Sequence, residues 1–346
     1  MLTALFINMN TYSNMKKRTH PLKDSFNRRI DYLRVSVTDK CNLKCVYCTP
    51  SKGLKHFKET DLLTDKEIIR FISIAQRHGL RKVRVTGGEP LLRKDIIQLI
   101  ASIKKIGIRE LSLTTNGLML SQMARELKSA GLDRVNISLD TLDAEKYRVI
   151  ANGGDINLVW EAIKEAEKVD LMPVKINVVP IRGINDDEIL SFASLTFEKN
   201  YHIRFIELMP ANCNRLWTQE KCIHSHEIME RISMLGTVNK LKFRGIGPSR
   251  NYRLKGATGV IGIISPVSDH FCNSCNRLRL TAVGKIRPCL FSEEEIDIRT
   301  PMRSGVSDDG IDKLFLQAVT VKPEGHKLHE IISGNSPIKS MLKIGG

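Results

Sequence analysis

Three features that many proteins possess are missing from this sequence. It contains no run of eighteen apolar residues, so it predicts no transmembrane helix. It contains no G-x-x-x-x-G-K-[ST] motif, the loop that holds phosphates in many nucleotide-binding enzymes. Aromatic residues make up only 5% of the chain, whereas a nucleic-acid-binding surface interleaves aromatics with clustered cations. We therefore expect no membrane and no nucleic acid among the partners, and the cysteine groups described below predict a reducing, cytoplasmic compartment.

Acidic residues are also missing from the first 23 positions, which include the basic run Lys16-Lys-Arg-Thr-His20. An acid-free basic leader can direct a protein to an organelle, but this one is short and shows no clear amphipathic pattern. Its apolar patch at residues 2–7 has no basic region before it and is too short for a secretory signal. We expect residues 1–24 to form a flexible arm, and organellar targeting is the less favoured alternative.

The chain carries a strong excess of positive charge. Its 346 residues include 54 Lys and Arg against 38 Asp and Glu, a formal net charge of +16. Such a charge favours an anionic partner, and nucleic acid, an acidic membrane surface and a phosphorylated small molecule all fit it. The length suits one large α/β domain with an appendage, and hydrophobic residues, at 42%, are enough to bury a sizeable core.

From about residue 30 the sequence alternates between strand and helix patterns, which is typical of a parallel sheet. Thr64-Asp-Lys-Glu67 predicts a capping box for a helix that Gly79 ends. Ser121 is expected to cap a later helix that ends before Gly131, and residues 185–188 are expected to open the helix before the sixth strand. The expected strands are Tyr32–Thr38, Lys82–Thr86, Glu110–Thr115, Arg134–Asp140, Pro173–Val179 and Ile203–Met209.

Side chains alternate between the two faces of a strand, and the predicted strands have one apolar and one polar face. A sheet covered by helices on both faces should be apolar throughout, so we expect a curved sheet whose concave side lines a wet, cationic cavity. A half-exposed sheet with solvated charges is the alternative, which six consecutive crossover units disfavour. The polar face would bring together Arg34, Arg84, Thr114, Ser138 and Lys175.

Six of the eight cysteines form two groups of three, which favours metal chemistry over a disulfide scaffold. Three thiolates on one loop can hold three corners of a cubane iron–sulfur cluster and leave one iron open to a small molecule. Zinc is the alternative for each group, although C-x3-C-x2-C is an unusual zinc spacing. The groups are Cys41, Cys45 and Cys48, directly after the first predicted strand, and Cys272, Cys275 and Cys289.

Other residues near these groups point to ligands. Thr86-Gly-Gly-Glu-Pro90 comes at the end of the second predicted strand. Its glycines permit a ligand to approach the backbone closely, and Glu89 offers an acceptor for an ammonium group. The motif alone could also be a tight turn. His270 could be a fourth, zinc-completing ligand of the second group. Arg277 and Arg279 lie on one side of a predicted strand, and cations beside an open metal suggest a phosphorylated ligand. Cys213 and Cys222, in neither group, are expected to be ordinary free thiols.

The first cysteine run, with Tyr47 before its last cysteine, resembles the radical S-adenosylmethionine (radical SAM) enzymes. In that family the open iron binds SAM, and an electron from the cluster cleaves SAM to a 5′-deoxyadenosyl radical. Four longer stretches and a C-terminal Gly-Gly resemble one branch, the MoaA family of GTP 3′,8-cyclases, over residues 24–346. Thr49 and Val283 depart from the family pattern but are not proposed ligands. The stretches are Tyr32–Cys45, Val83–Arg93, Asn136–Asp140 and Phe271–Leu290.

This resemblance implies an α/β fold with an incomplete (β/α)6 TIM-like radical SAM barrel over residues 25–240. A C-terminal domain over 241–346 would carry a second cluster and end in the Gly-Gly tail. The implied reaction converts GTP to (8S)-3′,8-cyclo-7,8-dihydroguanosine 5′-triphosphate, the first step of molybdopterin biosynthesis. The implied cofactors are two 4Fe–4S clusters and SAM. The implied partners are a second copy in a homodimer, an electron donor and a downstream cyclic pyranopterin synthase.

The resemblance also implies roles for individual residues. The first cysteine group would cleave SAM, and Arg277 and Arg279 would act in catalysis. A different radical SAM enzyme with an auxiliary cluster, such as a peptide-modifying maturase, and a zinc-stabilised nucleic-acid-binding protein are the two rival interpretations. The implied SAM contacts are Tyr47, Gly88, Glu89, Ser138 and Met209. The implied GTP contacts are Arg34, Arg84, Thr114, Lys175, Arg277, Leu278 and Arg279.

Overall fold

The computed structural model describes residues 21–49, 55–210, 216–242, 247–332 and 341–345. The six expected strands form the middle of one sheet, parallel and in chain order. The predicted α/β barrel is therefore confirmed. The first strand and the last three end one to three residues before their predicted ends; beyond the last three, the chain leaves the sheet and borders the cavity. The strands are β1 Tyr32–Ser36, β2 Lys82–Thr86, β3 Glu110–Thr115, β4 Arg134–Ser138, β5 Lys175–Val178 and β6 His202–Ile206.

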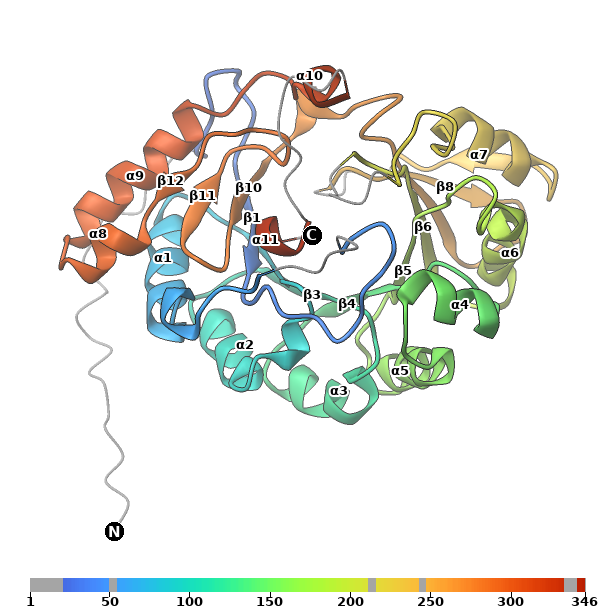
Figure 1. The fold of residues 1–346 in the computed structure, drawn as a ribbon, viewed down its shortest axis with the longest axis horizontal. Coiled ribbons are helices and arrows are strands. Elements are labelled where there is room, and N and C mark those ends of the chain that lie inside the picture. Colours follow the sequence, from blue (N-terminus) through green and yellow to red (C-terminus); the bar gives the residue numbers. More distant parts are fainter. Residues whose placement is uncertain (1–20, 50–54, 211–215, 243–246, 333–340, 346) are drawn as a thin grey trace, which may run out of the picture.

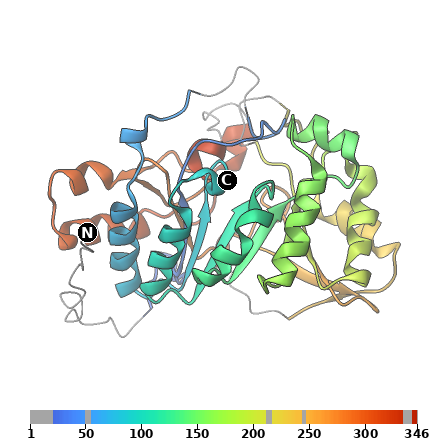
Figure 2. The same ribbon diagram turned by 90° about the horizontal axis from the view of Figure 1, so that it is seen from below.

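Helices cover the outer side of this curved sheet, as Figure 1 and the view turned by 90° in Figure 2 show. The apolar face of the strands packs against them, and Leu33, Val35 and Val83 are fully buried in that core. The predicted division into an apolar helix-facing side and a polar concave side is confirmed. The covering helices are α1 Asp65–Arg77, α2 Ile96–Lys105, α3 Leu120–Ser129, α4 Ala144–Ala151, α5 Ile156–Lys168 and α6 Ile189–Glu198.

The helix starts test three sequence predictions. The capping box of α1 is confirmed, because the Thr64 side chain accepts from the Glu67 amide and Glu67 accepts from the Thr64 amide. The Ser121 cap is wrong: Gly117 adopts a left-handed φ of 91°, so α3 starts at Leu120 and Ser121 lies inside its first turn. The predicted opening at 185–188 holds, since a 3-10 turn at Asp186–Glu188 leads directly into α6, but Asn185 makes no side-chain cap and bonds instead to backbone of residues 140, 179 and 181.

The C-terminal third extends the same sheet at both ends. Strand β9 (Val260–Ile264) pairs parallel with β6, and β10 (Arg277–Leu280) pairs parallel with β1. The predicted domain boundary near residue 240 stays a prediction, since strands from both sides of it share one twelve-stranded sheet. Antiparallel strands finish the two edges: β11 Lys285–Arg287 and β12 Ile296–Asp297 at one, β8 Arg250–Leu254 and β7 Val238–Lys240 at the other.

Five further helices complete the described chain. Helix α9 packs against α1 on the outside of the sheet, where the Phe71 and Phe315 rings meet edge to face at 5.8 Å. Helix α11 lies inside the ring of strands, with the C-terminus beside it (Figure 1). No described helix is long and apolar enough to cross a membrane. The helices are α7 Ser225–Ser233, α8 Arg299–Arg303, α9 Asp308–Thr320, α10 Leu328–Ile332 and α11 Met341–Ile344.

Candidate functional site

One cavity opens at the carboxyl ends of the parallel strands, where ligand sites of barrel folds lie. All six grouped cysteines line it, so the fold brings together two groups that are more than 220 residues apart in sequence. Lys175 and Leu278 are the only two predicted site residues that do not line it. The predicted residues along its wall, besides the cysteines, are Arg34, Tyr47, Arg84, Gly88, Glu89, Thr114, Ser138, Met209, Arg277 and Arg279.

The first cysteine group lies on the loop that follows β1. The Cys48 and Thr49 amides donate to the Cys45 carbonyl at 2.9 and 3.0 Å, which closes a tight turn. The Cys41 Sγ accepts from the Leu43 amide at 3.4 Å. Burial raises the pKa of Cys48 to about 12, and nearby Cys41 and Asp140 add to the shift. The three thiols are therefore close together and protonated without a metal, so a metal that binds them must displace protons.

The turn after β2 supports this loop. The Gly88 amide donates to the Thr38 carbonyl at 2.7 Å, and the Glu89 amide donates to the Lys40 carbonyl at 2.8 Å. A Cβ on Gly87 would lie 2.7 Å from the Thr38 oxygen, and a Cβ on Gly88 would overlap the Lys40 carbonyl. The two glycines thus allow the backbone of this turn to contact the backbone of the segment that leads into the cysteine loop.

Glu89 is 1% exposed, and both of its carboxylate oxygens accept protein hydrogen bonds. One oxygen accepts from the Thr115 hydroxyl at 2.8 Å and the Leu91 amide at 3.0 Å, and the other from the Asn116 amide at 2.7 Å. Burial raises the pKa of Glu89 to about 7, although the hydrogen bonds from these donors act to lower it. Glu89 therefore ties the end of β3 to the turn, and its predicted contact with an ammonium group stays a prediction.

Asp140 is a site residue to which the sequence interpretation gave no role. Its carboxylate accepts from the Tyr47 hydroxyl at 2.6 Å and from the Val179 amide at 2.8 Å. Burial raises the pKa of Asp140 to about 6. This side chain fastens the cysteine loop to the ends of β4 and β5. Its position two residues past Ser138 on the predicted polar face was the available signal.

The second cysteine group borders the same cavity beside the amino end of β10, the strand that pairs with β1. The Cys275 amide donates to the Cys272 carbonyl at 3.0 Å, and Cys289 follows β11. Burial raises the pKa of Cys272, and Cys289 and Cys275 contribute because they are close. Burial would also raise the pKa of Cys275, but Arg277 and Lys322 outweigh it and lower that pKa to about 6. This group is a cluster of thiols in a positive field, which suits a bound thiolate.

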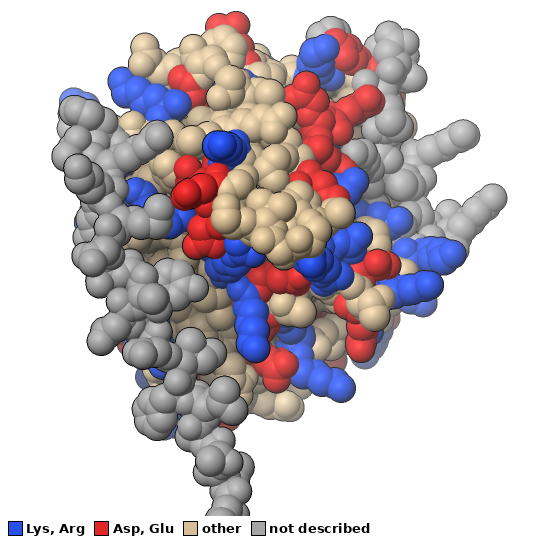
Figure 3. All heavy atoms as spheres, turned by 90° about the vertical axis from the view of Figure 1, so that its left-hand side faces the viewer, with Lys and Arg blue, Asp and Glu red and all other residues tan. Residues whose placement is uncertain are grey.

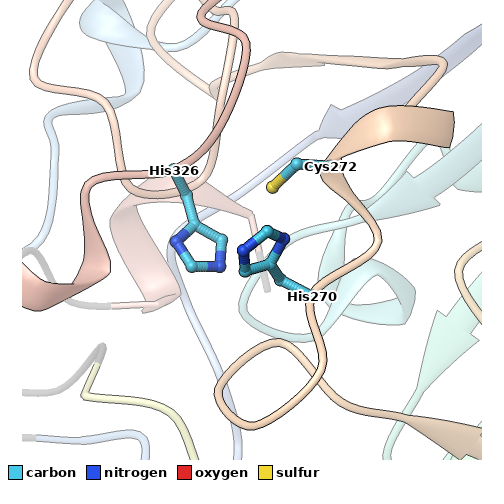
Figure 4. A group of neighbouring side chains, drawn as sticks. All are labelled: His270, Cys272 and His326. Atoms are coloured by element: carbon cyan, nitrogen blue, oxygen red, sulfur yellow. The ribbon is translucent and has the colours of Figure 1, made fainter.

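His270 and His326 flank Cys272, and the three ligand atoms lie within 4.8 Å of one another (Figure 4). This set bears on the zinc alternative, in which His270 is a ligand. His326 Nε2 lies 2.9 Å from the Pro266 carbonyl oxygen, and its Nδ1 accepts from the Leu328 amide at 3.4 Å. A metal bound here would compete for the Nδ1 lone pair and for Cys272. We therefore favour the three-cysteine set for this end of the cavity.

A cationic wall joins the two cysteine groups. The register pairs Arg34 with Arg84 on one side and with Arg279 on the other, so three guanidinium groups come from neighbouring strands. Arg277 lies over the Phe271 ring, with 4.8 Å between Cζ and the ring centroid. Burial lowers the pKa of Arg279 to about 10, with Arg277 as the next cause. Cations crowded this closely are stabilised by a bound anion.

A second polar layer lies deeper in the barrel. Lys82 Nζ is 4.8 Å from the Tyr32 ring centroid, and Arg84 also lies over that ring. Burial lowers the pKa of Lys175 to about 4, followed by repulsion from Arg204 and other cations. Burial would raise the pKa of Tyr32, but neighbouring cations, Arg84 first, lower it to about 7. Lys175 lies among the cations of this layer and does not line the cavity, so its predicted contact with GTP stays a prediction.

Arg204 on β6 lines the cavity but was missed from the sequence. It lies on the polar face of a predicted strand, so strand alternation could have found it. Among the described residues, its buried Nε has no hydrogen-bond partner, and the same holds for Thr114 Oγ1 and Asn177 Oδ1. All three residues line the cavity. A buried polar atom without a protein partner is expected to bond to a water, an ion or a ligand, so these atoms are compatible with the polar ligand that the sequence predicts.

The end of the described chain borders this cavity. The Gly345 carbonyl accepts from Arg279 Nη1 at 2.8 Å. Gly345 has a φ of 76°, and a Cβ there would lie 2.7 Å from the Ser36 Cβ, so only glycine fits this position. Met341 and Leu342 line the cavity, so the last described residues border it, and entry of the Gly-Gly tail into the site stays a prediction. Gly346, Cys213 and residues 1–20 of the predicted arm lie outside the described residues.

A partial α/β barrel with a C-x3-C-x2-C loop at the carboxyl ends of its strands defines a radical SAM enzyme. The model of the radical SAM superfamily matches residues 35–196, and the model described as Molybdenum Cofactor Synthesis C matches residues 201–328. Among curated relatives, the GTP 3′,8-cyclase of Heliobacterium modesticaldum is 48% identical over 93% of this chain and 99% of its own length. That of Thermodesulfovibrio yellowstonii is 45% identical over 94% of this chain and 100% of its own. The chain belongs to the GTP 3′,8-cyclase family.

Solved structures agree with this fold. Streptococcus suis SuiB bound to S-adenosylmethionine superposes with a TM-score of 0.58 and 15% identity, covering 82% of this chain and 68% of that chain. Native anSMEcpe with bound AdoMet gives a TM-score of 0.54 and 14% identity over 86% of this chain and 82% of that chain. At such low identity these similarities concern the fold alone.

Proposed function

We propose that this chain converts GTP to (8S)-3′,8-cyclo-7,8-dihydroguanosine 5′-triphosphate, the first step of molybdopterin biosynthesis, with SAM and two 4Fe–4S clusters. The observation that carries the proposal is the shared cavity, whose wall includes both three-cysteine groups and the arginines of neighbouring strands. Each cysteine group can serve one of two ligands, and the arginine side chains suit the phosphates of the second ligand. Membership of the GTP 3′,8-cyclase family supports the same reaction.

At the first cysteine group the protein holds and orients SAM. A cluster bound by Cys41, Cys45 and Cys48 would supply the electron that cleaves SAM, and the resulting 5′-deoxyadenosyl radical would remove the ribose 3′ hydrogen of GTP. Ser138 and Met209 line the cavity next to this loop, and the Tyr47 ring is fixed by Asp140. The backbone at Gly88 is held against the cysteine loop. These contacts orient the two reactants and keep water from the radical.

At the wall the protein holds the triphosphate. A guanidinium group can donate two hydrogen bonds to the oxygens of one phosphate, so Arg34, Arg84 and Arg279 can bind successive phosphates. We add Arg204 to the predicted contacts, because its unpartnered Nε lies in the cavity. Thr114 offers a hydroxyl without a partner. Leu278 can contribute only its backbone, because its side chain is buried in the hydrophobic core.

At the second cysteine group the protein holds the guanine end. A cluster on Cys272, Cys275 and Cys289 would keep one iron open, and Arg277, held by stacking on Phe271, lies beside it. Arg279 links this end to the wall and to the Gly345 carbonyl. We propose that Arg277 and Arg279 act together on the base and the phosphates during cyclisation. The homodimer, the electron donor and the downstream synthase stay predictions from the family.

The location of the positive charge weighs against the nucleic-acid alternative. On the face drawn in Figure 3, Lys and Arg are interspersed with Asp and Glu and form no basic patch. Many cations instead lie inside the protein, including the almost fully buried Arg279, Arg287 and Lys322. An interior field suits a small anion such as a nucleoside triphosphate. A peptide-modifying activity would not need an arginine wall inside the barrel.

Anaerobic incubation with GTP, SAM and dithionite tests the proposed function. The expected result is one 5′-deoxyadenosine for each cyclised product. The product mass should equal that of GTP, because the hydrogen atom that leaves with 5′-deoxyadenosine is replaced by one electron from dithionite and one proton from water when the cyclised radical is reduced. Replacing GTP by ATP serves as the control and should give little product. Release of 5′-deoxyadenosine with unchanged GTP would contradict the assignment of substrate while keeping the radical SAM chemistry.

We expect GTP binding to take up protons. The pKa of Lys175, about 4, and that of Lys82, about 7, are lowered by burial and by crowded cations, so Lys175 is neutral near pH 7 in the ligand-free protein. A bound triphosphate attracts protons to both amines and raises both pKa values. Binding that takes up a proton weakens as pH rises, by up to about tenfold per pH unit for each proton.

Calorimetric titration of the SAM-free protein with GTP, in buffers of different ionisation enthalpy, measures this uptake. Lys175→Met should reduce the number of protons taken up, whereas Lys66→Met, at an exposed position on α1, should leave it unchanged. Binding that releases protons, or equal uptake in the wild type and Lys175→Met, would contradict the expectation that this amine gains a proton when GTP binds.

A further inference from the structure

We propose that Lys322 is a positioning residue for the second cluster: it holds the cysteine triad together, slows loss of the cluster's iron and raises the cluster's reduction potential. The inference rests on the proposed second cluster at Cys272, Cys275 and Cys289. Lys322 lies two residues after the end of α9, in a segment that the sequence marked with no motif. Its side chain is 3% exposed.

The Lys322 ammonium group has three hydrogen-bond acceptors, one for each of its hydrogens. Nζ lies 3.5 Å from the Cys275 Sγ, 2.9 Å from the Arg277 carbonyl and 2.8 Å from the Pro288 carbonyl. Pro288 directly precedes Cys289, the third cysteine of the group. One buried cation therefore fixes the sulfur of one proposed ligand and the backbone next to another.

The remaining cysteine is fastened to the same segment by Arg28. Arg28 Nη1 donates to the Cys272 carbonyl at 2.9 Å and to the Glu324 carbonyl at 2.6 Å. Its Nη2 donates to the Pro323 carbonyl at 2.6 Å, and its Nε pairs with Asp24. Lys322 and Arg28 together thus tie all three cysteine positions to residues 322–324. Both side chains are buried, so the arrangement is rigid and not an exposed pairing.

The chemistry of the contact predicts an electrostatic effect as well as a mechanical one. A buried ammonium group is costly unless an anion or good acceptors compensate it, and a cluster thiolate is such an anion. Hydrogen bonds and positive charge at cluster sulfurs raise the reduction potential, because reduction adds negative charge. At the first group, by contrast, the Cys41 Sγ accepts from the neutral Leu43 and Asn116 amides. The ammonium contact therefore distinguishes the second group chemically.

The test uses the full chain with Cys41, Cys45 and Cys48 replaced by alanine, so that only the second cluster can form. Lys322→Met, Lys322→Arg and the exposed α9 control Lys313→Met are compared in this background. Redox titration followed by electron paramagnetic resonance gives the potential, and chelator challenge gives the rate of iron loss. For Lys322→Met we expect at least a tenfold lower reduced-to-oxidised ratio at a fixed potential, about 59 mV for one electron. Iron should also be lost at least tenfold faster.

Lys322→Arg, which keeps the charge, should recover at least half of the potential shift, and Lys313→Met should match the parent. Equal potentials and iron loss in Lys322→Met and the parent would overturn the inference, and so would equal defects in Lys322→Met and Lys322→Arg. If Lys322→Met yields no folded protein, the arginine variant decides: a retained cluster supports the inference and a lost one overturns it. A parent that builds no cluster would instead overturn the proposed second cluster, and the inference with it.

Discussion

Cys45→Ala should abolish the release of 5′-deoxyadenosine from SAM while leaving the second cysteine group able to hold its cluster. The reason is the separation of the groups: Cys45 lies with Cys41 and Cys48 on one loop, and the other three thiols lie across the cavity. Loss of a metal ligand should cost more than the roughly 10–100-fold that loss of a supporting group costs. Iron should fall by about half, as measured by colorimetric assay on the anaerobically reconstituted protein.

Cys275→Ala should have the opposite effect: it should remove the second cluster and leave the first one intact. SAM cleavage should continue without coupling to GTP, because the first group is intact, while the cyclised product disappears. Cys222→Ala is the matched control, since Cys222 is a buried cysteine outside both groups. If Cys45→Ala and Cys275→Ala had the same effect on 5′-deoxyadenosine release, the two groups would not have separate roles and the proposed division of labour would be wrong.

Gly88→Ala should remove the first cluster without touching any of its ligands. A Cβ at this position would overlap the Lys40 carbonyl, and the Gly88 amide is held to Thr38 at 2.7 Å, so the turn must move away from the cysteine loop. Forcing extra atoms into such a contact costs about 1–3 kcal/mol of stability. We expect SAM cleavage to fall at least tenfold and iron at the first group to be lost.

Gly247→Ala is the control for this variant, because a Cβ there meets no atom of the described residues within 4 Å. Denaturant unfolding and iron analysis of both variants, with the second group intact, separate a local from a general effect. A Gly88→Ala protein with full iron content and normal SAM cleavage would mean that the turn and the cysteine loop do not depend on each other.

The sequence predicts most of the barrel because strand and helix periodicity are local. Strands β2 and β3 match their predicted ranges to the residue, and the apolar and polar faces follow from alternation alone. The extra parallel partners β9 and β10 could not be predicted in this way. Each pairs with a strand distant in the chain, and pairing of that kind depends on the tertiary fold rather than on the pattern of one segment.

The candidate site was predictable where a motif or a strand face marked it. Arg34, Arg84 and Thr114 were found by alternation, and the same rule applied to the sixth strand would have found Arg204. Lys322 carries no such mark, because its three acceptors lie 34 to 47 residues away along the chain. A lysine becomes informative only when the fold surrounds it with a thiol and two carbonyl groups.

Some residues had a clear chemical identity but a different use from the predicted one. Asn185 is a residue type that often caps a helix N-terminus, yet its side-chain amide donates to the Asp140 carbonyl at 2.6 Å and to the Val179 carbonyl at 3.0 Å. Glu89 has the carboxylate expected for a ligand contact, yet both oxygens accept from the protein. Tertiary contacts take precedence over local preference where a buried polar group has to be satisfied.

The central claim is that one cavity brings SAM at the first cysteine group to the ribose of GTP held by the arginine wall. The most direct measurement uses GTP labelled with deuterium at the ribose 3′ position, with SAM and dithionite under anaerobic conditions. The account predicts that one deuterium appears in each 5′-deoxyadenosine and is lost from the cyclised product. Unlabelled 5′-deoxyadenosine, with the deuterium still in GTP, would contradict it.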